Sequence, residues 1–154
     1  MEPDAQLSDT VDQVTIALGL QLGVTAAFVV GMTVIHSLGL LGITRALRLK
    51  DDRLKEQAFD VRAVWLMARL GLFVFLLHLF EIVIFGAFYL VVGGVETVEE
   101  ALYFSASAYA TLGHTDEYFP QEWRLIGAVE ALIGFILIGW STAFMVSTMR
   151  KLIE

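Results

Sequence analysis

The residues with the clearest chemical meaning are Thr111 to Asp116, which read Thr-Leu-Gly-His-Thr-Asp. They lie between a short amphipathic segment, 99–110, and a long apolar one, 125–146. Non-helical backbone at membrane depth is tolerated only where it is buried in protein or lines a water-filled cavity. A short helix, a glycine-bearing loop and a full span are therefore the parts of a re-entrant pore loop, and they predict passage of ions.

Ionisable residues inside the apolar spans form a second group of candidates. His78 and Glu81 are three residues apart on one helical face, and such groups are costly in lipid unless they are partnered. We expect them to satisfy each other, or to bond a hydroxyl of the short helix such as Ser105 or Ser107. Glu130, two turns into the last span, is expected to brace the short helix from behind.

Metal binding and catalysis are poorly supported by the spacing of the polar residues. The three histidines are scattered along the chain, and His36 is interpreted as a packed or interfacial histidine near the cytoplasmic end of its span. Only His78 and Glu81 have ligand spacing. The chain has no HExxH motif and no phosphate-binding glycine loop. We therefore expect neither an enzyme nor a cofactor, and an intramembrane enzyme using His78 and Glu81 is the least favoured alternative.

The composition indicates a membrane protein. The 154 residues are 57% hydrophobic, with a mean hydropathy of +0.72 and no cysteine. The absence of cysteine excludes disulfides and thiolate metal sites. The net charge of -7 belongs to tails and loops, so the expected partner is membrane lipid rather than nucleic acid. This length is expected to leave no room for a soluble regulatory domain.

Three apolar stretches are each long enough to cross about 30 Å of hydrocarbon as a helix. The predicted fold is an all-α membrane protein with three transmembrane helices, one re-entrant pore helix and a filter loop. The first span is not a signal peptide, because acidic residues precede it. The predicted segments are a tail (1–13), a first span (14–44), a charged linker (45–62), a second span (63–92), a segment with pore helix and filter (93–123) and a third span (124–150).

The basic residues predict the orientation. They cluster in the linker 45–62 and after the third span, whereas the tail 1–13 has no lysine or arginine. The positive-inside rule then places the linker and the C-terminus in the cytoplasm and the acidic N-terminus outside. The expected location of the protein is the inner (plasma) membrane of the cell. The linker is interpreted either as a helix at the inner interface or as a solvated charged connection.

The pore helix itself has small residues between Ser105 and Ala110 that permit tight packing. Four such helices would point the partial negative charge of their C-terminal ends at a central cavity, which favours a cation. Glu99 and Glu100 complement the dipole at the other end. The alternative is a span interrupted by a loop, without conduction.

The order of outer helix, pore helix, filter and inner helix over residues 63–149 resembles the tetrameric pore-loop cation channels of the potassium-channel superfamily. Their filter signature is Thr-Val-Gly-Tyr-Gly-Asp. The stretches 78–82, 122–125 and 139–143 resemble small bacterial ion channel proteins with an additional N-terminal helix. The resemblance implies a homotetramer in which Thr111, Leu112, Gly113, His114 and Thr115 line the filter, with Asp116 at its end. Of these, Thr111, Leu112 and Gly113 would coordinate monovalent cations.

Two departures from this signature affect selectivity. The signature tyrosine is His114, which cannot form the family's tether to pore-helix aromatics, here Tyr103 and Phe104. The second glycine is Thr115, and a β-branched residue fits positive φ poorly. We therefore expect a passive channel for potassium and other monovalent cations, including sodium, with reduced selectivity. The alternative is a non-conducting membrane subunit or adaptor.

Two groups of residues are expected to support this pore. The first would hold the filter and comprises Tyr103, Phe104, Ser107, His78, Glu81 and Glu130. The second comprises Gly134 and Gly139, because glycine in a helix interior costs about 1 kcal/mol relative to alanine and so needs a reason. The reason is either bending for gating, with Gly134 at the hinge position of the family, or close helix packing.

Overall fold

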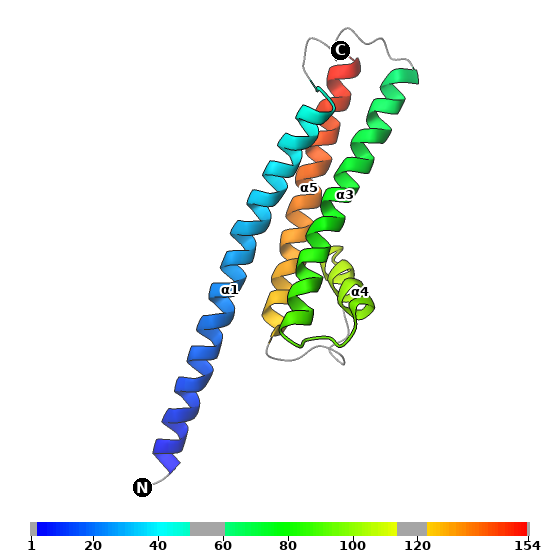
Figure 1. The fold of residues 1–154 in the computed structure, drawn as a ribbon. Coiled ribbons are helices and arrows are strands. Elements are labelled where there is room, and N and C mark those ends of the chain that lie inside the picture. The colour runs from blue at the N-terminus through cyan, green and yellow to red at the C-terminus, as the bar shows by residue number, and fades with distance from the viewer. Residues whose placement is uncertain (1–2, 50–60, 114–122, 154) are drawn as a thin grey trace.

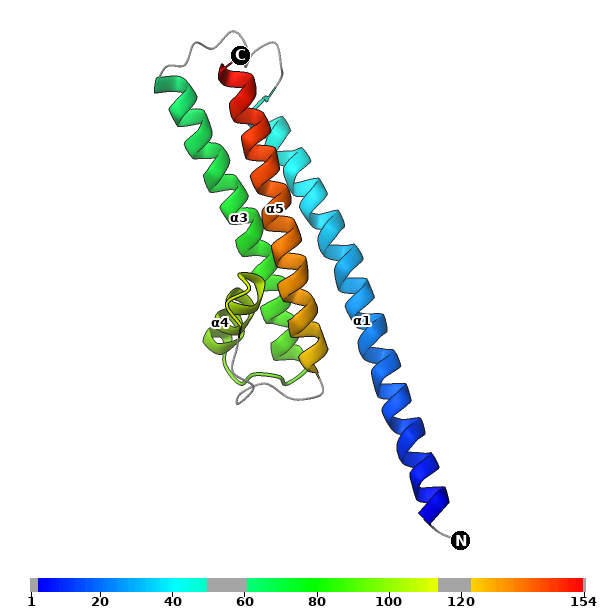
Figure 2. The same cartoon turned by 180° about the vertical axis from the view of Figure 1, so that it is seen from behind.

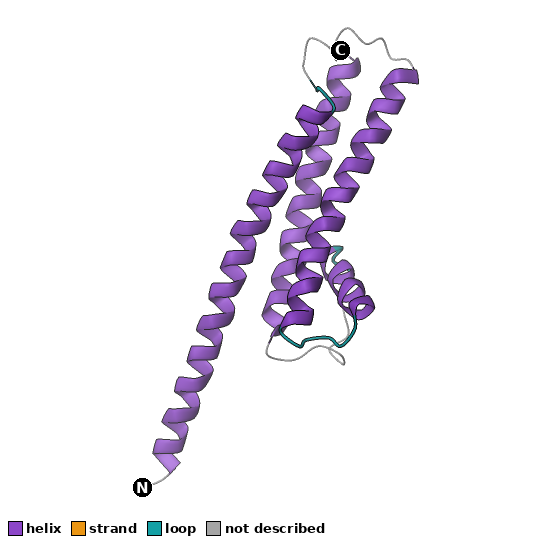
Figure 3. Cartoon of the chain, viewed as in Figure 1, coloured by secondary structure: helices purple, strands orange, loops and turns teal. Residues whose placement is uncertain are grey.

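The computed structural model describes residues 3–49, 61–113 and 123–153, and all regular structure within them is helical. The described residues form three long helices and one short one, arranged as in Figures 1 and 3. Their bounds are α1 Pro3–Ala46, α3 Val61–Val91, α4 Val98–Tyr109 and α5 Arg124–Ile153. Three of them, over Thr15–Ala46, Val61–Val91 and Arg124–Leu152, are long and apolar enough to cross a membrane. The predicted all-α membrane fold is thereby confirmed.

The helices are longer than the predicted spans at most of their ends. α1 begins at Pro3, so it takes in most of the segment 1–13 that was predicted as a tail. α3 begins inside the predicted linker 45–62, whose residues 50–60 lie outside the described part of the chain. With 44 residues, α1 is about 66 Å long, roughly twice the thickness of the hydrocarbon core.

The helices lie in a bundle from which part of α1 projects. The C-terminal half of α1 lies beside α3 and α5, whereas its N-terminal part extends past the end of the bundle in both Figure 1 and Figure 2. Side chains on this part are exposed, among them Ile16 at 72% and Leu20 at 62%. The end of α1, the start of α3 and the C-terminus share one end of the bundle.

α4 begins at a capping box. The backbone N–H of Glu100 donates to Thr97 Oγ1 at 3.1 Å, and the Thr97 N–H donates to the Glu100 carboxylate at 3.1 Å. This exchange satisfies donors that a helix start otherwise leaves unpaired, so the first turn is well defined. Thr97 was not singled out from the sequence, although Thr-x-x-Glu is the pattern of this cap.

α4 ends in a Schellman turn. The N–H of Thr111 donates to the carbonyl of Ala108 at 2.8 Å, and the N–H of Leu112 donates to that of Ser107 at 2.9 Å. Thr111 consequently has a φ of 59°, a left-handed conformation that normally belongs to glycine at this position. Gly113 follows with a φ of 77°. The chain thus turns sharply immediately after the helix.

The main core lies where α4 meets the long helices. Phe85 and Tyr89 of α3, Phe104 of α4 and Ile126 of α5 are all buried there. The rings of Tyr89 and Phe104 meet edge to face with centroids 4.9 Å apart. A second cluster joins α1 to α3 through Leu40, Ile43, Leu70 and Val74. The core therefore fixes α4 in place against both α3 and α5.

Candidate functional site

α4 runs antiparallel to α3 and parallel to α5, so its C-terminal end lies deep inside the bundle. A Cβ built at Gly86 of α3 would lie 3.3 Å from the carbonyl oxygen of Ala101, near the start of α4. Tyr109, at the end of α4, bonds His78 instead, eight residues and so about 12 Å away along α3. The loop after Tyr109 thus starts near the middle of the bundle.

The loop itself is described only in its first half. Thr111, Leu112 and Gly113 are exposed in the single chain, with Leu112 at 79%. The other three predicted filter residues, His114, Thr115 and Asp116, lie outside the described residues.

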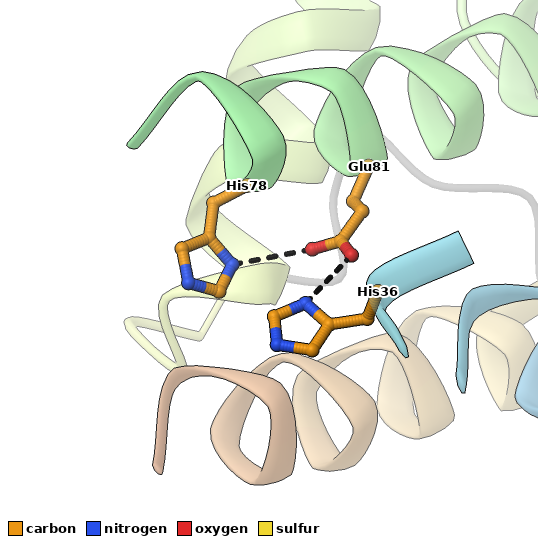
Figure 4. A group of neighbouring side chains, drawn as sticks. All are labelled: His36, His78 and Glu81. Atoms are coloured by element: carbon orange, nitrogen blue, oxygen red, sulfur yellow. Dashed lines mark hydrogen bonds and ion pairs between the residues drawn. The ribbon is translucent and has the colours of Figure 1, made fainter. Parts of the chain in front are cut away.

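Glu81 of α3 is the centre of a buried polar cluster. Its Oε1 lies 2.9 Å from His36 Nδ1 and its Oε2 lies 3.2 Å from His78 Nδ1. Figure 4 shows both imidazoles directed at this one carboxylate. The Tyr109 hydroxyl donates to Oε2 at 2.5 Å and also lies 2.8 Å from His78 Nδ1. The cluster therefore joins α1, α3 and the end of α4.

His36 is a packed histidine, which is one of the two interpretations drawn from the sequence. It is fully buried and bonds Glu81, in the interior of α3, so the interfacial alternative is wrong. Its Nε2 lies 3.3 Å from Ser141 Oγ of α5, which adds the fourth helix to the cluster. The histidines were described as scattered because their spacing along the chain was considered, whereas folding brings two of them to one acid.

Glu130 of α5 forms a second buried cluster, which contacts the same face of α4 one turn before Tyr109. The Ser105 hydroxyl lies 2.5 Å from Glu130 Oε1, and the Tyr89 hydroxyl donates to Oε2. The Ser105 hydroxyl also donates to the carbonyl of Ile82 at 2.9 Å. One hydroxyl proton cannot serve two acceptors fully. All three contacts are satisfied as hydrogen bonds when Glu130 is protonated. Its Oε1 then donates to Ser105 Oγ, the Ser105 hydroxyl donates to the carbonyl of Ile82, and Oε2 accepts from Tyr89.

The other predicted supporting residues differ in their surroundings. Phe104 is buried, with its ring against Tyr89 and next to Gly127. Ser107 is buried and its carbonyl accepts the N–H of Leu112 in the Schellman turn. Tyr103 is 67% exposed in the single chain. The two aromatic residues that were paired as tether positions therefore lie on different sides of α4.

Gly134 and Gly139 are not equivalent. A Cβ built at Gly134 would overlap the carbonyl of Tyr109, lying 2.9 Å from its carbon, whereas a Cβ at Gly139 would have no atom within 4 Å. Gly134 thus has a packing reason, because α5 and the end of α4 approach closely only without a side chain there. The expected bending at either glycine is not tested by this geometry.

Four residues of these clusters were missed as site residues: His36, Tyr89, Tyr109 and Ser141. A signal for His36 was present, since an ionisable side chain within a span needs a partner and Glu81 needs more than one donor. The tyrosines gave no such signal, because aromatic residues are common in apolar helices.

The two clusters together hold one face of α4 at two successive turns. Glu81 bonds its last residue from α3, and Glu130 bonds its middle from α5. Hydrogen bonds of this kind add direction to the apolar contacts, so the depth and rotation of α4 are specified. The arrangement is suited to positioning the loop that follows α4.

Comparison with known proteins gives one match. A family model described as "Ion channel" matches residues 64–151, which include α4, the described part of the loop and almost all of α3 and α5. α1 lies outside the matched range. No curated protein and no solved structure matches the chain.

Proposed function

The chain belongs to the ion channel family, and from this premise we propose that it is a passive cation channel of the potassium-channel type. Residues 111–116 would be its filter, with Thr111, Leu112 and Gly113 contributing carbonyl oxygens to a monovalent cation site. The observation that carries the proposal is α4, a helix of 12 residues that ends in the middle of a bundle of spans. Its C-terminal end supplies partial negative charge where a cation would enter the filter.

The proposed assembly is a homotetramer in the plasma membrane, with the N-terminus outside. Several side chains of α4 and α5 that do not enter the core are large and exposed. Tyr103, Leu132 and Phe135 are 67%, 58% and 68% exposed. Four copies around one axis would cover part of this surface, and lipid would cover the remainder.

One observation favours the alternative of a non-conducting subunit or adaptor. Thr111 adopts the left-handed conformation of a helix cap, so the chain turns at the first residue of the proposed filter. A filter needs successive carbonyls directed at one axis, which this turn does not provide in the isolated chain. Assembly would have to extend residues 111–113 for conduction.

The first prediction is cation over anion selectivity. Purified full-length protein in liposomes should give dilution potentials that follow the cation gradient, because α4 directs carbonyl charge inward and the loop carries Asp116 and Glu117. We expect a permeability ratio of at least about ten, equivalent to about 1.4 kcal/mol. Equal cation and anion flux would contradict the proposal, and no flux at all would favour the adaptor.

The second prediction concerns the choice between potassium and sodium. The double variant His114→Tyr with Thr115→Gly should raise the potassium-to-sodium permeability ratio from bi-ionic reversal potentials, because glycine accepts the positive φ that threonine resists. The single variant Thr115→Ala is the matched control, since it removes the branch without giving glycine's freedom. An unchanged ratio in the double variant would show that these two positions do not set selectivity.

A further inference from the structure

His36, His78 and Glu81 place three metal-ligating side chains around one point inside the bundle. Each offers one ligand atom, and these three atoms all lie within 4.8 Å of one another. His36 comes from α1 and the other two from α3 (Figure 4). His36 and Glu81 are fully buried, and the side chain of His78 is 15% exposed. The ion channel function proposed above uses Glu81 through its bond to Tyr109, and it gives no role to the convergence of two imidazoles on the same carboxylate.

We propose that these residues form a binding site for a divalent transition metal ion of the zinc type. Zinc binds nitrogen and oxygen at about 2.0–2.2 Å, so neighbouring ligand atoms in a tetrahedral site are about 3.3–3.5 Å apart. The distances from Glu81 to His36 and His78 are 2.9 and 3.2 Å, so small side-chain shifts would open the set around an ion. Tyr109 provides a further oxygen, 2.8 Å from His78 Nδ1.

The donor types select the class of metal. Two imidazoles and one carboxylate suit zinc, cobalt, nickel and copper, whereas magnesium and calcium prefer sites made of oxygen alone. The set is also distinct from the proposed filter, which would coordinate monovalent cations through backbone carbonyls.

Ser141 gives His36 the second contact that a metal-bound histidine usually has. A histidine that binds metal through one ring nitrogen commonly directs the other at an oxygen, which fixes its tautomer. His36 has Nδ1 at the cluster and Nε2 at Ser141 Oγ, 3.3 Å away. With the proton on Nε2 donated to Ser141, the Nδ1 lone pair is free for a metal ion.

Charge also favours an ion here. The partners that the structure gives Glu81 are His36, His78 and Tyr109, and none of them is a lysine or arginine. No permanently charged basic side chain among these partners faces the buried carboxylate, and an unbalanced charge among apolar helices is unfavourable. A divalent ion would balance the charge of this carboxylate.

The test is Co²⁺ binding to the full-length, tag-free protein in detergent, measured by visible absorption. The wild type should bind one Co²⁺ per chain, with absorption bands of a low-coordinate site that Zn²⁺ abolishes by competition. His36→Gln, His78→Gln and Glu81→Gln should each weaken binding at least about 100-fold. Ser141→Ala, which removes only the contact behind His36, should weaken it by about 10–100-fold.

His114→Gln is the matched control, because it removes the third histidine of the chain and none of the proposed ligands. This variant should bind Co²⁺ as the wild type does.

The proposal fails if the wild type binds no stoichiometric Co²⁺, or if His36→Gln and His78→Gln bind as well as the wild type. Loss of binding only in His114→Gln would also overturn it. Circular dichroism identifies any variant that has unfolded. If His36→Gln or Glu81→Gln unfolds, the Co²⁺ affinity of His78→Gln tests the proposal, because His78 is the least buried of the three ligands. The absorption does not depend on conduction, so this test stands apart from the flux measurements.

Discussion

Replacing Glu130 with alanine is expected to abolish ion flux and to lower the thermal stability of the protein. The change removes the carboxyl that bonds Ser105 of α4 and Tyr89 of α3, both in the buried interior. Interhelical hydrogen bonds in membranes contribute about 0.6–1.7 kcal/mol each, so the loss is about 1–3 kcal/mol per chain. The larger effect is on flux, because α4 loses the contact that sets its rotation next to the proposed filter.

Glu130→Gln is the control for this prediction. Its amide N–H can donate to Ser105 Oγ while its oxygen accepts from Tyr89, which reproduces the pattern of a protonated carboxyl. We therefore expect the glutamine variant to retain flux and a melting temperature close to that of the wild type. If glutamine is as damaging as alanine, Glu130 acts as a charged group and the neutral arrangement is wrong.

Gly134→Ala is expected to be the most damaging conservative substitution in the chain. Its methyl group would overlap the carbonyl of Tyr109, and a backbone atom cannot turn aside as a flexible side chain can. Overpacking of this kind typically costs about 1–3 kcal/mol. The end of α4 must also move, so both the melting temperature in detergent and the flux in liposomes should fall.

Gly139→Ala separates packing from bending at these glycines. Nothing in the described part of the chain lies within 4 Å of a methyl group there, so this variant should fold normally and gain up to about 1 kcal/mol of helix propensity. If Gly134→Ala instead keeps its melting temperature and changes only channel opening, bending rather than close packing is the role of Gly134.

The three spans could be predicted from the sequence because the bilayer imposes a simple requirement on the segments that cross it. A stretch such as 63–92 must be helical and apolar over its whole length, so hydropathy alone locates it to within a few residues of α3, Val61–Val91. The short helix was also predicted, at 99–110 against Val98–Tyr109 for α4, because its acidic first turn and its small side chains are local features. The cap residue Thr97 is equally local but was missed. The start of α1 was less predictable, because the acidic residues before the apolar stretch belong to the same helix.

The partners of the buried polar residues could not be predicted in the same way. His36 and Glu81 meet only because α1 crosses α3 at that depth, and the crossing is decided by the packing of apolar side chains such as Leu40 and Val74. The spacing of residues along α3 indicated that His78 and Glu81 lie on one face, but it gives no information on contacts with another helix. Gly134 was ambiguous for the same reason, since its contact is with the backbone of another element.

The bond between His36 and Glu81 also has a consequence for biosynthesis. The two residues are 45 positions apart, so at about 5–20 residues per second the ribosome adds Glu81 roughly 2–9 seconds after His36. α1 also leaves the ribosome before α3 does, so its imidazole can reach the bilayer ahead of its acidic partner. The bond that joins the two helices can form only after α3 has followed, which makes the docking of α1 a late step in assembly of the bundle.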